Sequence, residues 1–272
     1  MKVQDLRFSI IGAGALGGAV ARGLARAGCD VTASCPHPER RQEVLADGVR
    51  LTANNHTAVS SGEIVMFAVK PHLTLGVIEE LAPLLKGKLC VSLAAVVPLR
   101  LLAKTAPGGR WSRAMTSICA AMGVAFTGVA VPGDSTEEDQ KLLIDAFSLL
   151  GDAALTEEGK LDALTSLTGA APAFFLELME AAAMGGIQAG LPKDLAYKGA
   201  AAAVMGTARL VLDSDRTPSE LRDSICTPGG MTIEGIAELE RAGTRGTMMR
   251  AVLATAEKGR VLTEKLLRDL ER

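Results

Sequence analysis

The chain has 272 residues and a formal net charge of −2 at pH 7, with 48% hydrophobic but only 3% aromatic residues. Such a charge gives no basic surface for nucleic acid or for an anionic membrane, and we expect neither partner. The length is enough for one large domain or two smaller ones with an aliphatic core.

The five cysteines and three histidines show neither disulfide nor metal-site spacing. We therefore expect no metal ion and a reducing, cytoplasmic location. No uninterrupted apolar run approaches the roughly 20 residues that a transmembrane helix requires. The N-terminus also lacks the order of a signal peptide, so we expect a soluble protein.

A glycine-rich segment follows the first expected strand, Arg7–Ile11, and opens a helix that ends at Gly28. Its sequence is Gly12-Ala13-Gly14-Ala15-Leu16-Gly17. In this spacing the first glycine permits a tight turn, the second admits a pyrophosphate to the backbone, and the third lets the helix pack on the strand. The helix N-terminus then faces the phosphates. The segment predicts a dinucleotide site, although glycine-rich turns also occur for packing reasons alone.

The end of the second expected strand, residues 29–34, bears on the choice of dinucleotide. NAD-selective sites usually place Asp or Glu there, but this chain has Ser34. A carboxylate that would repel a 2′-phosphate is missing. Arg40 and Arg41 follow shortly, although both could be the solvated start of a helix. We expect NADP(H) to be preferred over NAD(H).

Further strands are expected at Glu63–Val69, Leu89–Ala95 and Gly123–Val131, followed by a helix that Ser135 caps. Alternating strands and helices predict a parallel sheet covered on both faces, an α/β fold of Rossmann type. Ligands bind outside the carboxyl ends of such strands, so Val69-Lys70-Pro71 should face the cofactor. Alternatively, Pro71 merely ends the strand and Lys70 is a surface charge.

From about Leu161 onward the strand signal disappears. Residues 171–190 and 194–214 have long helical patterns that are apolar almost all round, as in helices buried on more than one side. Such helices would hardly bury themselves alone, so we expect a homodimer, or a higher assembly, through this half. The expected division is a dinucleotide-binding domain over residues 1–160 and a helical dimerisation and substrate-binding domain over residues 161–272.

One short segment interrupts these helices. Thr217-Pro218-Ser219-Glu220 is a capping box that starts a helix running to about Ile225. The sequence GMTIEGIAELE, residues 230–240, then starts another helix. Two glycines and a proline lie between the two helices.

Gly229 and Gly230 leave backbone N–H groups uncovered at the start of the second helix, and the hydroxyls of Thr227 and Thr232 lie beside them. These donors at the positive end of a helix predict an anion site of carboxylate size. The alternative is a tight connector in which the threonines act only as caps.

The residues at this point resemble the pyrroline-5-carboxylate reductase family, and the resemblance runs from end to end of the chain. It is carried by the glycine motif, Ala68–Pro71, Thr165–Phe175, Ala189–Pro192 and, most specifically, TPGGMTIEG. The last segment is similar to the family's Ser-Pro-Gly-Gly-x-Thr-Ile signature. The resemblance implies NADPH-dependent reduction of a small cyclic imine carboxylate, 1-pyrroline-5-carboxylate, to L-proline.

The resemblance also implies roles for individual residues. Thr227, Gly229 and Gly230 would hold the carboxylate, with Met231 beside them, and Thr232 would bind the imine nitrogen and help to deliver or hold its proton. The expected cofactor contacts are Ser34 and Asn55 at the adenosine-ribose phosphate and Ala68, Val69, Lys70 and Pro71 near the nicotinamide. In this family the helical half forms an interlocked dimer, so the loop would meet a nicotinamide of the other subunit.

The chain departs from the family pattern close to where reduction should occur. The family's Met-Pro-Asn-Thr-Pro is Met115-Thr116-Ser117-Ile118-Cys119 here, its Ser-Gly-Ser-Gly-Pro is Thr168-Gly169-Ala170-Ala171-Pro172, and a usual glycine is Val96. Ile118, Cys119 and Ala170 make the expected wall of the site more apolar. A paralogue that reduces a larger or less polar cyclic imine is therefore an open alternative.

Two other functional classes are also open. A hydroxy-acid dehydrogenase would need a base in the helical half, for which Lys193 and Lys198 are the candidates. A non-catalytic NADP-binding dimeric protein would bind the cofactor without imine turnover.

Overall fold

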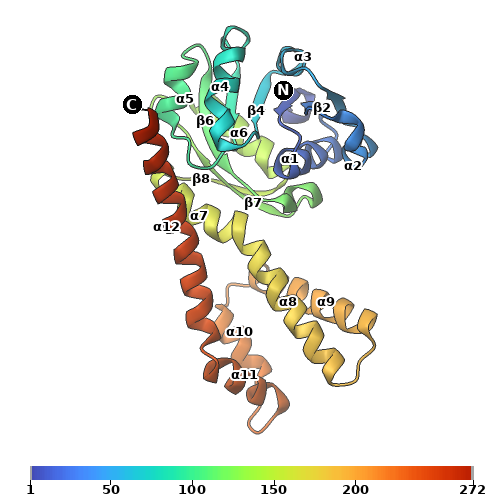
Figure 1. Cartoon of the computed structure of the whole chain (residues 1–272). Coiled ribbons are helices and arrows are strands. Elements are labelled where there is room, and N and C mark those ends of the chain that lie inside the picture. Colours follow the sequence, from blue (N-terminus) through green and yellow to red (C-terminus); the bar gives the residue numbers. More distant parts are fainter. Residues whose placement is uncertain (1, 271–272) are drawn as a thin grey trace. The chain divides into compact units, whose positions relative to one another are not determined.

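The structure is a computed structural model that describes residues 2–270 (Figure 1). It contains one eight-stranded sheet in the order β3-β2-β1-β4-β5-β6-β7-β8. The strands are β1 (Arg7–Ile11), β2 (Asp30–Ser34), β3 (Arg50–Thr52), β4 (Ile64–Phe67), β5 (Leu89–Ser92), β6 (Arg110–Met115), β7 (Ala125–Ala130) and β8 (Gly151–Leu155). The order of the first six strands is typical of dinucleotide-binding α/β folds.

The sheet is parallel, as predicted, apart from the antiparallel pair of β6 and β7. The connection between these two strands contains only a short 3₁₀ helix, η4 (Ile118–Met122), which is too short for a parallel crossover. The sequence analysis places β1, β2, β4, β5 and β7 but misses β3, β6 and β8. β3 has only three residues, β6 carries two arginines and β8 begins with Gly-Asp, so none of the three shows a clear apolar pattern.

Helices cover both faces of the sheet. On one face, α1 (Ala15–Arg26), α2 (Gln42–Ala46) and α6 (Glu137–Ser148) pack on a shared core. On the other face lie α3 (Asn55–Ser61), α4 (Pro71–Leu81) and α5 (Leu99–Thr105). Burial of each large aliphatic side chain in these cores stabilises the fold by about 1.5–3 kcal/mol.

The cap of α6 differs from the sequence expectation. Thr136, not Ser135, is the capping residue, and its Oγ1 accepts a hydrogen bond from the N–H of Asp139 at 3.1 Å. The remaining 3₁₀ helices are η1 (Val3–Asp5), η2 (Pro38–Arg40), η3 (Ala82–Leu84) and η5 (Glu158–Lys160).

The chain forms two compact units. The sheet unit comprises the chain up to Ala170 and the segment from Ala254 onward, and the helical unit comprises Ala171–Leu253. The sheet unit includes α7 (Leu161–Thr165) and a π-helical turn, η6 (Ser166–Ala170). The helical unit contains α8 (Ala171–Gln188), α9 (Lys193–Leu212), α10 (Pro218–Ile225) and α11 (Met231–Arg241), while α12 (Thr244–Leu270) has residues in both units.

The helical unit buries few of its apolar side chains. Its buried hydrophobic residues are three alanines, Ala171, Ala183 and Ala196. Its exposed large hydrophobic residues are Phe175, Leu176, Leu178, Met184, Ile187, Leu191, Leu195, Tyr197, Val204, Met205, Leu210, Leu212, Ile225, Met231, Ile233, Leu239, Met249 and Leu253. The unit therefore lacks a closed core within a single chain.

Candidate functional site

The carboxyl ends of β1 and β4 form the switch point of the sheet, where the strand order reverses direction. Ile11 and Phe67, the last residues of these strands, are register partners. The two turns that follow, Gly12–Gly17 and Ala68–Pro71, therefore start next to each other, and the N–H of Ala68 donates to the Ile11 carbonyl at 2.8 Å. Ligands of α/β sheets bind in the crevice at such a point.

Each glycine of the turn after β1 has its own structural reason. Gly12 has a φ of 100°, and a Cβ there would lie 2.8 Å from Val69 Cγ1. A Cβ at Gly17 would lie 2.2 Å from the Gly12 carbonyl oxygen, so α1 packs directly on the turn. Gly14 precedes α1 and has no heavy atom within 4 Å of such a Cβ. Its backbone is open to a ligand, as the second glycine of a dinucleotide site must be.

The first turn of α1 provides hydrogen-bond donors for phosphates. The N–H groups of Ala15, Leu16 and Gly17 lie in this turn, where no helix carbonyl precedes them. The positive end of the helix dipole lies at the same place. The predicted glycine motif thus leads into N–H groups at the positive end of a helix, which is the arrangement that a phosphate site requires.

Ser34 ends β2, is fully buried and fixes the glycine turn. Its carbonyl accepts hydrogen bonds from the N–H groups of Gly12 at 3.1 Å and Ala13 at 2.7 Å. Its hydroxyl donates to Asn55 Oδ1 at 2.7 Å, which links β2 to the first residue of α3. No carboxylate ends β2. Arg40 and Arg41 are surface residues, each 3.8 Å from a neighbouring glutamate.

Val69, Lys70 and Pro71 connect β4 to α4. Pro71 is the first residue of the helix, where its fixed φ is favourable, so it starts α4 as well as ending the strand. Lys70 is exposed, and its carbonyl accepts a hydrogen bond from Thr74 Oγ1 at 3.2 Å. Within residues 2–270 the Lys70 ammonium makes no ion pair, which leaves it available to a ligand at this edge of the sheet.

The loops after β5 and β6 contain features that the sequence did not reveal. Val96 has a φ of 63° and is the only non-glycine residue with positive φ in the described part of the chain. A β-branched side chain is strained in this region. Thr116 Oγ1 accepts a hydrogen bond from the buried Thr127 hydroxyl at 2.9 Å, and Ser117 caps η4. The hydroxyl oxygens of this segment therefore already accept hydrogen bonds, that of Thr116 from β7 and that of Ser117 from η4.

Arg113 on β6 is a buried charge, with its side chain only 6% exposed. Its Nη1 donates to Glu158 Oε1 at 2.9 Å, whereas its Nε and Nη2 have no partner among the described residues. The same Glu158 oxygen accepts a hydrogen bond from the N–H of Leu99 at 2.7 Å. Glu158 thus joins β6 to the start of α5, a link that no local pattern in the sequence signals.

The backbone of η4 packs closely against α1, and the Arg26 side chain of α1 donates to the Ala121 carbonyl at 2.9 Å. A Cβ at Gly23 would lie 2.2 Å from the carbonyl oxygen of Ala120, so glycine is required for this approach. Ile118, in the first turn of η4, is 56% exposed. Residues Met115–Cys119, which differ from the family pattern, run from the end of β6 into η4. The position of these residues therefore depends on the position of α1.

The loop between α10 and α11 has the helix ends that the sequence predicts, but the N–H of Gly230, expected to be uncovered, has a partner within the turn. α10 begins with the capping box of Thr217 and Glu220, and α11 begins at Met231, with Gly230 as its cap residue. Gly229 has a φ of 67°, and the N–H of Gly230 donates to the Thr227 carbonyl at 3.0 Å. A Cβ at Gly230 would lie 2.3 Å from Thr227 Oγ1, so this hydroxyl lies against the glycine backbone.

The first turn of α11 offers donors to an anion. Gly230 provides no side-chain cap, and the N–H groups of the first turn have no preceding helix carbonyl. Met231 is 94% exposed, so the turn opens to solvent in the single chain. Thr232 lines a cavity of about 230 Å³ whose walls include Leu221 and Ile236. A carboxylate suits the donors, whereas Thr227, Gly229, Gly230 and Met231 do not line this cavity.

The predicted site residues fall on two units. Ser34, Asn55 and the turns after β1 and β4 belong to the sheet unit, whereas Thr227–Thr232 belong to the helical unit. Lys193 and Lys198, the candidate bases of a dehydrogenase, are both exposed on α9. Within residues 2–270 no group of three His, Cys, Asp or Glu side chains could hold a metal ion.

Comparison with known proteins decides the family. Residues 158–262 match the model of the pyrroline-5-carboxylate reductase dimerisation domain, and residues 7–96 match that of NADP oxidoreductase, coenzyme F420-dependent. The chain is 38% identical to the pyrroline-5-carboxylate reductase of Pisum sativum over 261 residues, 94% of this chain and 96% of that protein. The chain belongs to the pyrroline-5-carboxylate reductase family.

Two further family members extend the comparison. The pyrroline-5-carboxylate reductase of Glycine max is 39% identical over 266 residues, 96% of this chain and 97% of that protein. The crystal structure of Plasmodium falciparum pyrroline carboxylate reductase with NADP bound has the same fold, with a TM-score of 0.86 and 23% identity. That comparison covers 96% of this chain and 99% of the other.

One helical run within the matched dimerisation region has the length and hydropathy of a membrane span. Residues Glu158–Gln188 form 31 residues of helix, whose most apolar 18-residue stretch has a mean hydropathy of 1.3 and is 11% buried. Glu177 and Glu180 interrupt its apolar residues, so the sequence shows no uninterrupted apolar run here. Interior helices of water-soluble proteins meet the same criteria, and a dimer interface is a second reason for an apolar surface here.

Proposed function

We propose that this protein reduces 1-pyrroline-5-carboxylate to L-proline with NADPH. The observation that carries the proposal is the turn of Thr227, Gly229 and Gly230 before α11, where the uncapped N–H groups of the first helical turn suit one small carboxylate. In this proposal residues 1–160 are the dinucleotide-binding domain, and residues 161–272 are the dimerisation and substrate-binding domain.

The sheet unit holds the cofactor. The open backbone of Gly14 and the first turn of α1 bind the pyrophosphate. Ser34 and Asn55 lie at the adenosine-ribose phosphate, and Ala68, Val69, Lys70 and Pro71 lie at the nicotinamide. NADPH supplies the hydride. The missing carboxylate at the end of β2 supports NADPH as the preferred cofactor, with NADH as a weaker alternative.

The helical unit holds the substrate. The Thr227 hydroxyl and the N–H groups of Gly229 and Met231 bind the carboxylate beside Gly230, whose own N–H is used within the turn, and the Thr232 hydroxyl binds the imine nitrogen and keeps its proton there. A protonated imine accepts hydride without a further base, so positioning and charge stabilisation provide the catalysis. The exposed positions of Lys193 and Lys198 agree with a reaction that needs no lysine.

Self-association through the helical unit is part of the proposal. Its many exposed large hydrophobic residues suit a homodimer, or a higher assembly built from dimers, in which the loop of one subunit serves the nicotinamide of its partner. All five cysteines are free thiols, which supports a cytoplasmic location. Nucleic acid and membrane are not partners in this proposal.

The test is to follow NADPH oxidation with 1-pyrroline-5-carboxylate. We expect turnover that Thr232→Ala lowers at least about tenfold in kcat, because a hydrogen bond at the reacting nitrogen is lost. Thr263→Ala removes a hydroxyl that donates only to the Gly259 carbonyl, and it should leave turnover unchanged. Equal rates in the two variants would exclude the proposed role of Thr232.

The same assay separates the alternatives. Faster turnover of a six-membered imine carboxylate would favour a paralogue for larger imines, in line with the apolar Ile118, Cys119 and Ala170. NADPH binding without any imine turnover would favour a non-catalytic protein. Reduction of NADP⁺ by a hydroxy acid, seen as formation of NADPH in the reverse assay, would favour a dehydrogenase.

A glycine pair tests the cofactor site. Gly14→Ala adds a methyl group only to the open side of the turn, so it should weaken NADPH binding about tenfold or more with little loss of stability. Gly76→Ala, in α4, also adds a methyl group to open space and is the matched control. Unchanged NADPH affinity in Gly14→Ala would contradict the assignment of the pyrophosphate.

A further inference from the structure

The loop after β5, residues 93–98, lies at the nicotinamide side of the proposed cofactor site. β5 is the neighbour of β4 in the sheet, and the N–H of Leu93 donates to the Phe67 carbonyl at 2.8 Å, so the loop starts beside the turn Ala68–Pro71. A dinucleotide lies across the crevice at the switch point of such a sheet. Because its adenosine half is assigned to the end of β2, its nicotinamide half extends over β4 and β5.

The middle of this loop is strained. Val96 has a φ of 63° and is 8% exposed, and this backbone conformation is costly for a β-branched residue. Strained residues persist only where the surrounding structure fixes them, and they cluster at functional sites. The start of the loop is fixed by the bond from Leu93 and by Ser92 Oγ, which accepts a hydrogen bond from the N–H of Ala94 at 3.3 Å. The other end needs a second fixed point, because Pro98, the cap residue of α5, offers no side-chain cap.

Glu158 provides that second fixed point. Its Oε1 accepts a hydrogen bond from the N–H of Leu99, the first residue of α5, at 2.7 Å. The same oxygen accepts a hydrogen bond from Arg113 Nη1 at 2.9 Å. The Arg113 side chain is only 6% exposed, and its Nε and Nη2 have no partner among residues 2–270, so the guanidinium depends on this carboxylate. Because a buried guanidinium requires a countercharge, Arg113 in turn keeps Glu158 charged and in place.

We propose that Arg113 and Glu158 are positioning residues for hydride transfer, an inference that rests on the proposed function. Through Leu99 they hold the loop after β5, with its strained Val96, against the nicotinamide ring. The pyrophosphate is assigned to Gly14 and the first turn of α1, which this pair does not hold. Loss of the pair should therefore slow hydride transfer, where a misplacement of about 1 Å costs on the order of 100-fold in rate, but leave the affinity for NADPH nearly unchanged.

The test is Glu158→Ala in the full-length protein, at a temperature where the variant is folded. We expect kcat for imine reduction to fall at least about tenfold, while the dissociation constant of NADPH changes less than about twofold. The emission of bound NADPH, which reports the surroundings of its nicotinamide ring, should fall toward that of free NADPH. Glu158→Gln keeps an oxygen that can accept from Leu99, so it should retain a larger kcat than Glu158→Ala, and it supplies the same measurements if Glu158→Ala does not fold.

Phe147→Leu is the control for stability alone. Phe147 is fully buried on α6, in the core of the opposite face of the sheet, and a smaller side chain there lowers the midpoint of urea unfolding. Phe147→Leu should leave both kcat and the emission of bound NADPH unchanged. If Glu158 had only a structural role, Glu158→Ala would behave in the same way as this control.

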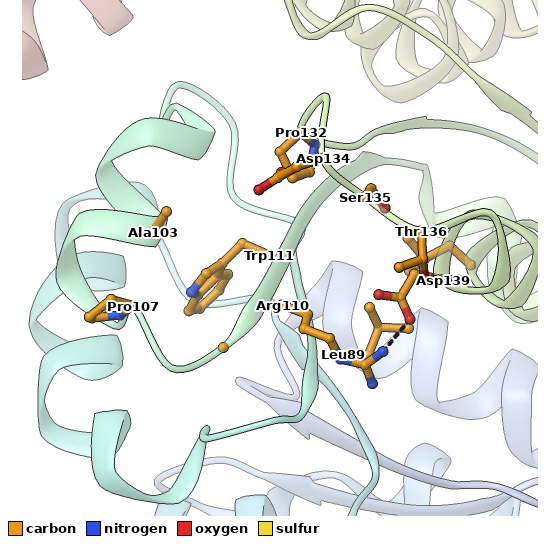
Figure 2. A pocket seen from close by; sticks show the side chains of 12 residues that line it. Leu89, Ala103, Pro107, Arg110, Trp111, Pro132, Asp134, Ser135, Thr136 and Asp139 are labelled. Carbon is orange, nitrogen blue, oxygen red and sulfur yellow. Dashed lines mark hydrogen bonds and ion pairs between the residues drawn. The ribbon is translucent and has the colours of Figure 1, made fainter.

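Trp111 reports whether α5 itself stays in place. Figure 2 shows its ring directed toward Ala103 of α5 and Pro107 just beyond that helix. Its Nε1 donates at 2.8 Å to the carbonyl of Ala106, the cap residue at the end of α5, and it is the only tryptophan of the chain. Its emission, measured without cofactor, should be unchanged in Glu158→Ala, because only the loop before α5 is released.

Three results would overturn the inference: a kcat of Glu158→Ala equal to that of Phe147→Leu, a loss of NADPH affinity as large as the loss of kcat, or an unchanged emission of bound NADPH. A shifted Trp111 emission would also contradict it, because α5 itself would then be displaced. Absence of imine turnover in the unaltered protein would instead refute the proposed function, and the emission of bound NADPH would still decide whether the pair holds the loop.

Discussion

The sheet unit buries its large apolar side chains, whereas the helical unit leaves most of them exposed. In the sheet unit, Phe8, Ile10, Leu24 and Phe147 are fully buried in a core that the chain closes by itself. In the helical unit the buried hydrophobic residues are alanines, and Met205 is 72% exposed. The contrast indicates that a single chain suffices to fold the sheet unit, whereas the helical unit needs the surface of a second chain.

The largest effect should come from a charge on the helical surface. Leu176→Glu, on α8, replaces a side chain that is 58% exposed in the single chain. A buried, unpaired carboxylate costs about 3 kcal/mol or more, so the dissociation constant of the dimer should rise more than about 100-fold. Sedimentation over a range of protein concentrations measures this change.

Leu45→Glu makes the same substitution at an exposed leucine of α2 in the sheet unit, and it should leave the assembly intact. If Leu176→Glu remained as associated as Leu45→Glu, the exposed apolar face of α8 would not be an interface.

Within the sheet unit, the buried ion pair should have the next largest effect. Glu158→Gln leaves the buried guanidinium of Arg113 without a countercharge, which should lower the free energy of unfolding by about 3 kcal/mol. Urea denaturation followed by Trp111 fluorescence measures this loss.

Glu157→Gln is the control for Glu158→Gln. Glu157 is 76% exposed and pairs with Lys160, so its loss should cost less than about 0.5 kcal/mol. Similar unfolding midpoints for the two variants would contradict the structural role of the Arg113–Glu158 pair.

The parts of the molecule that were predicted from the sequence depend on local patterns. The glycine spacing located the turn after β1, and the capping box and the paired glycines located the ends of α10 and α11. The unpredicted parts depend on distant residues. Arg113 breaks the strand pattern of β6 because its partner lies 45 positions away, and the π-helical turn before α8 has no local signal.

Because the backbone at Val96 is strained, a glycine variant there should be more stable than an alanine variant, which is the reverse of the usual order. Glycine normally costs about 0.5–1 kcal/mol relative to alanine, but a φ of 63° favours glycine. Val96→Ala and Val96→Gly both lose the packing of the valine, and only Val96→Gly relieves the strain. We expect Val96→Gly to be more stable than Val96→Ala by about 1 kcal/mol in thermal unfolding. The usual order, with alanine more stable, would show that the backbone is not strained there.

An effect of similar size concerns Asp47. Hydrogen bonds from Arg22 and Arg26 lower the pKa of its carboxyl, so the pair stabilises the fold above the unfolded pKa of about 4 and stops doing so as the pH falls through the lower folded value. Asp47→Asn should cost about 1 kcal/mol at pH 7. The unfolding free energies of the two proteins should converge below about pH 4. A difference that persists at low pH would show that the carboxylate charge is not the cause.

The backbone contact between Gly23 and Ala120 has a consequence for how the substrate range can evolve. Because α1 approaches η4 through main-chain atoms, the placement of η4 depends on glycine at position 23 and little on the exposed side chain of Ile118. Random substitutions at Ile118 should therefore be tolerated far better than any at Gly23, whereas Cys119 packs against the core and tolerates less change. Directed evolution toward new imines should begin at Ile118, where chemical variety costs the scaffold little.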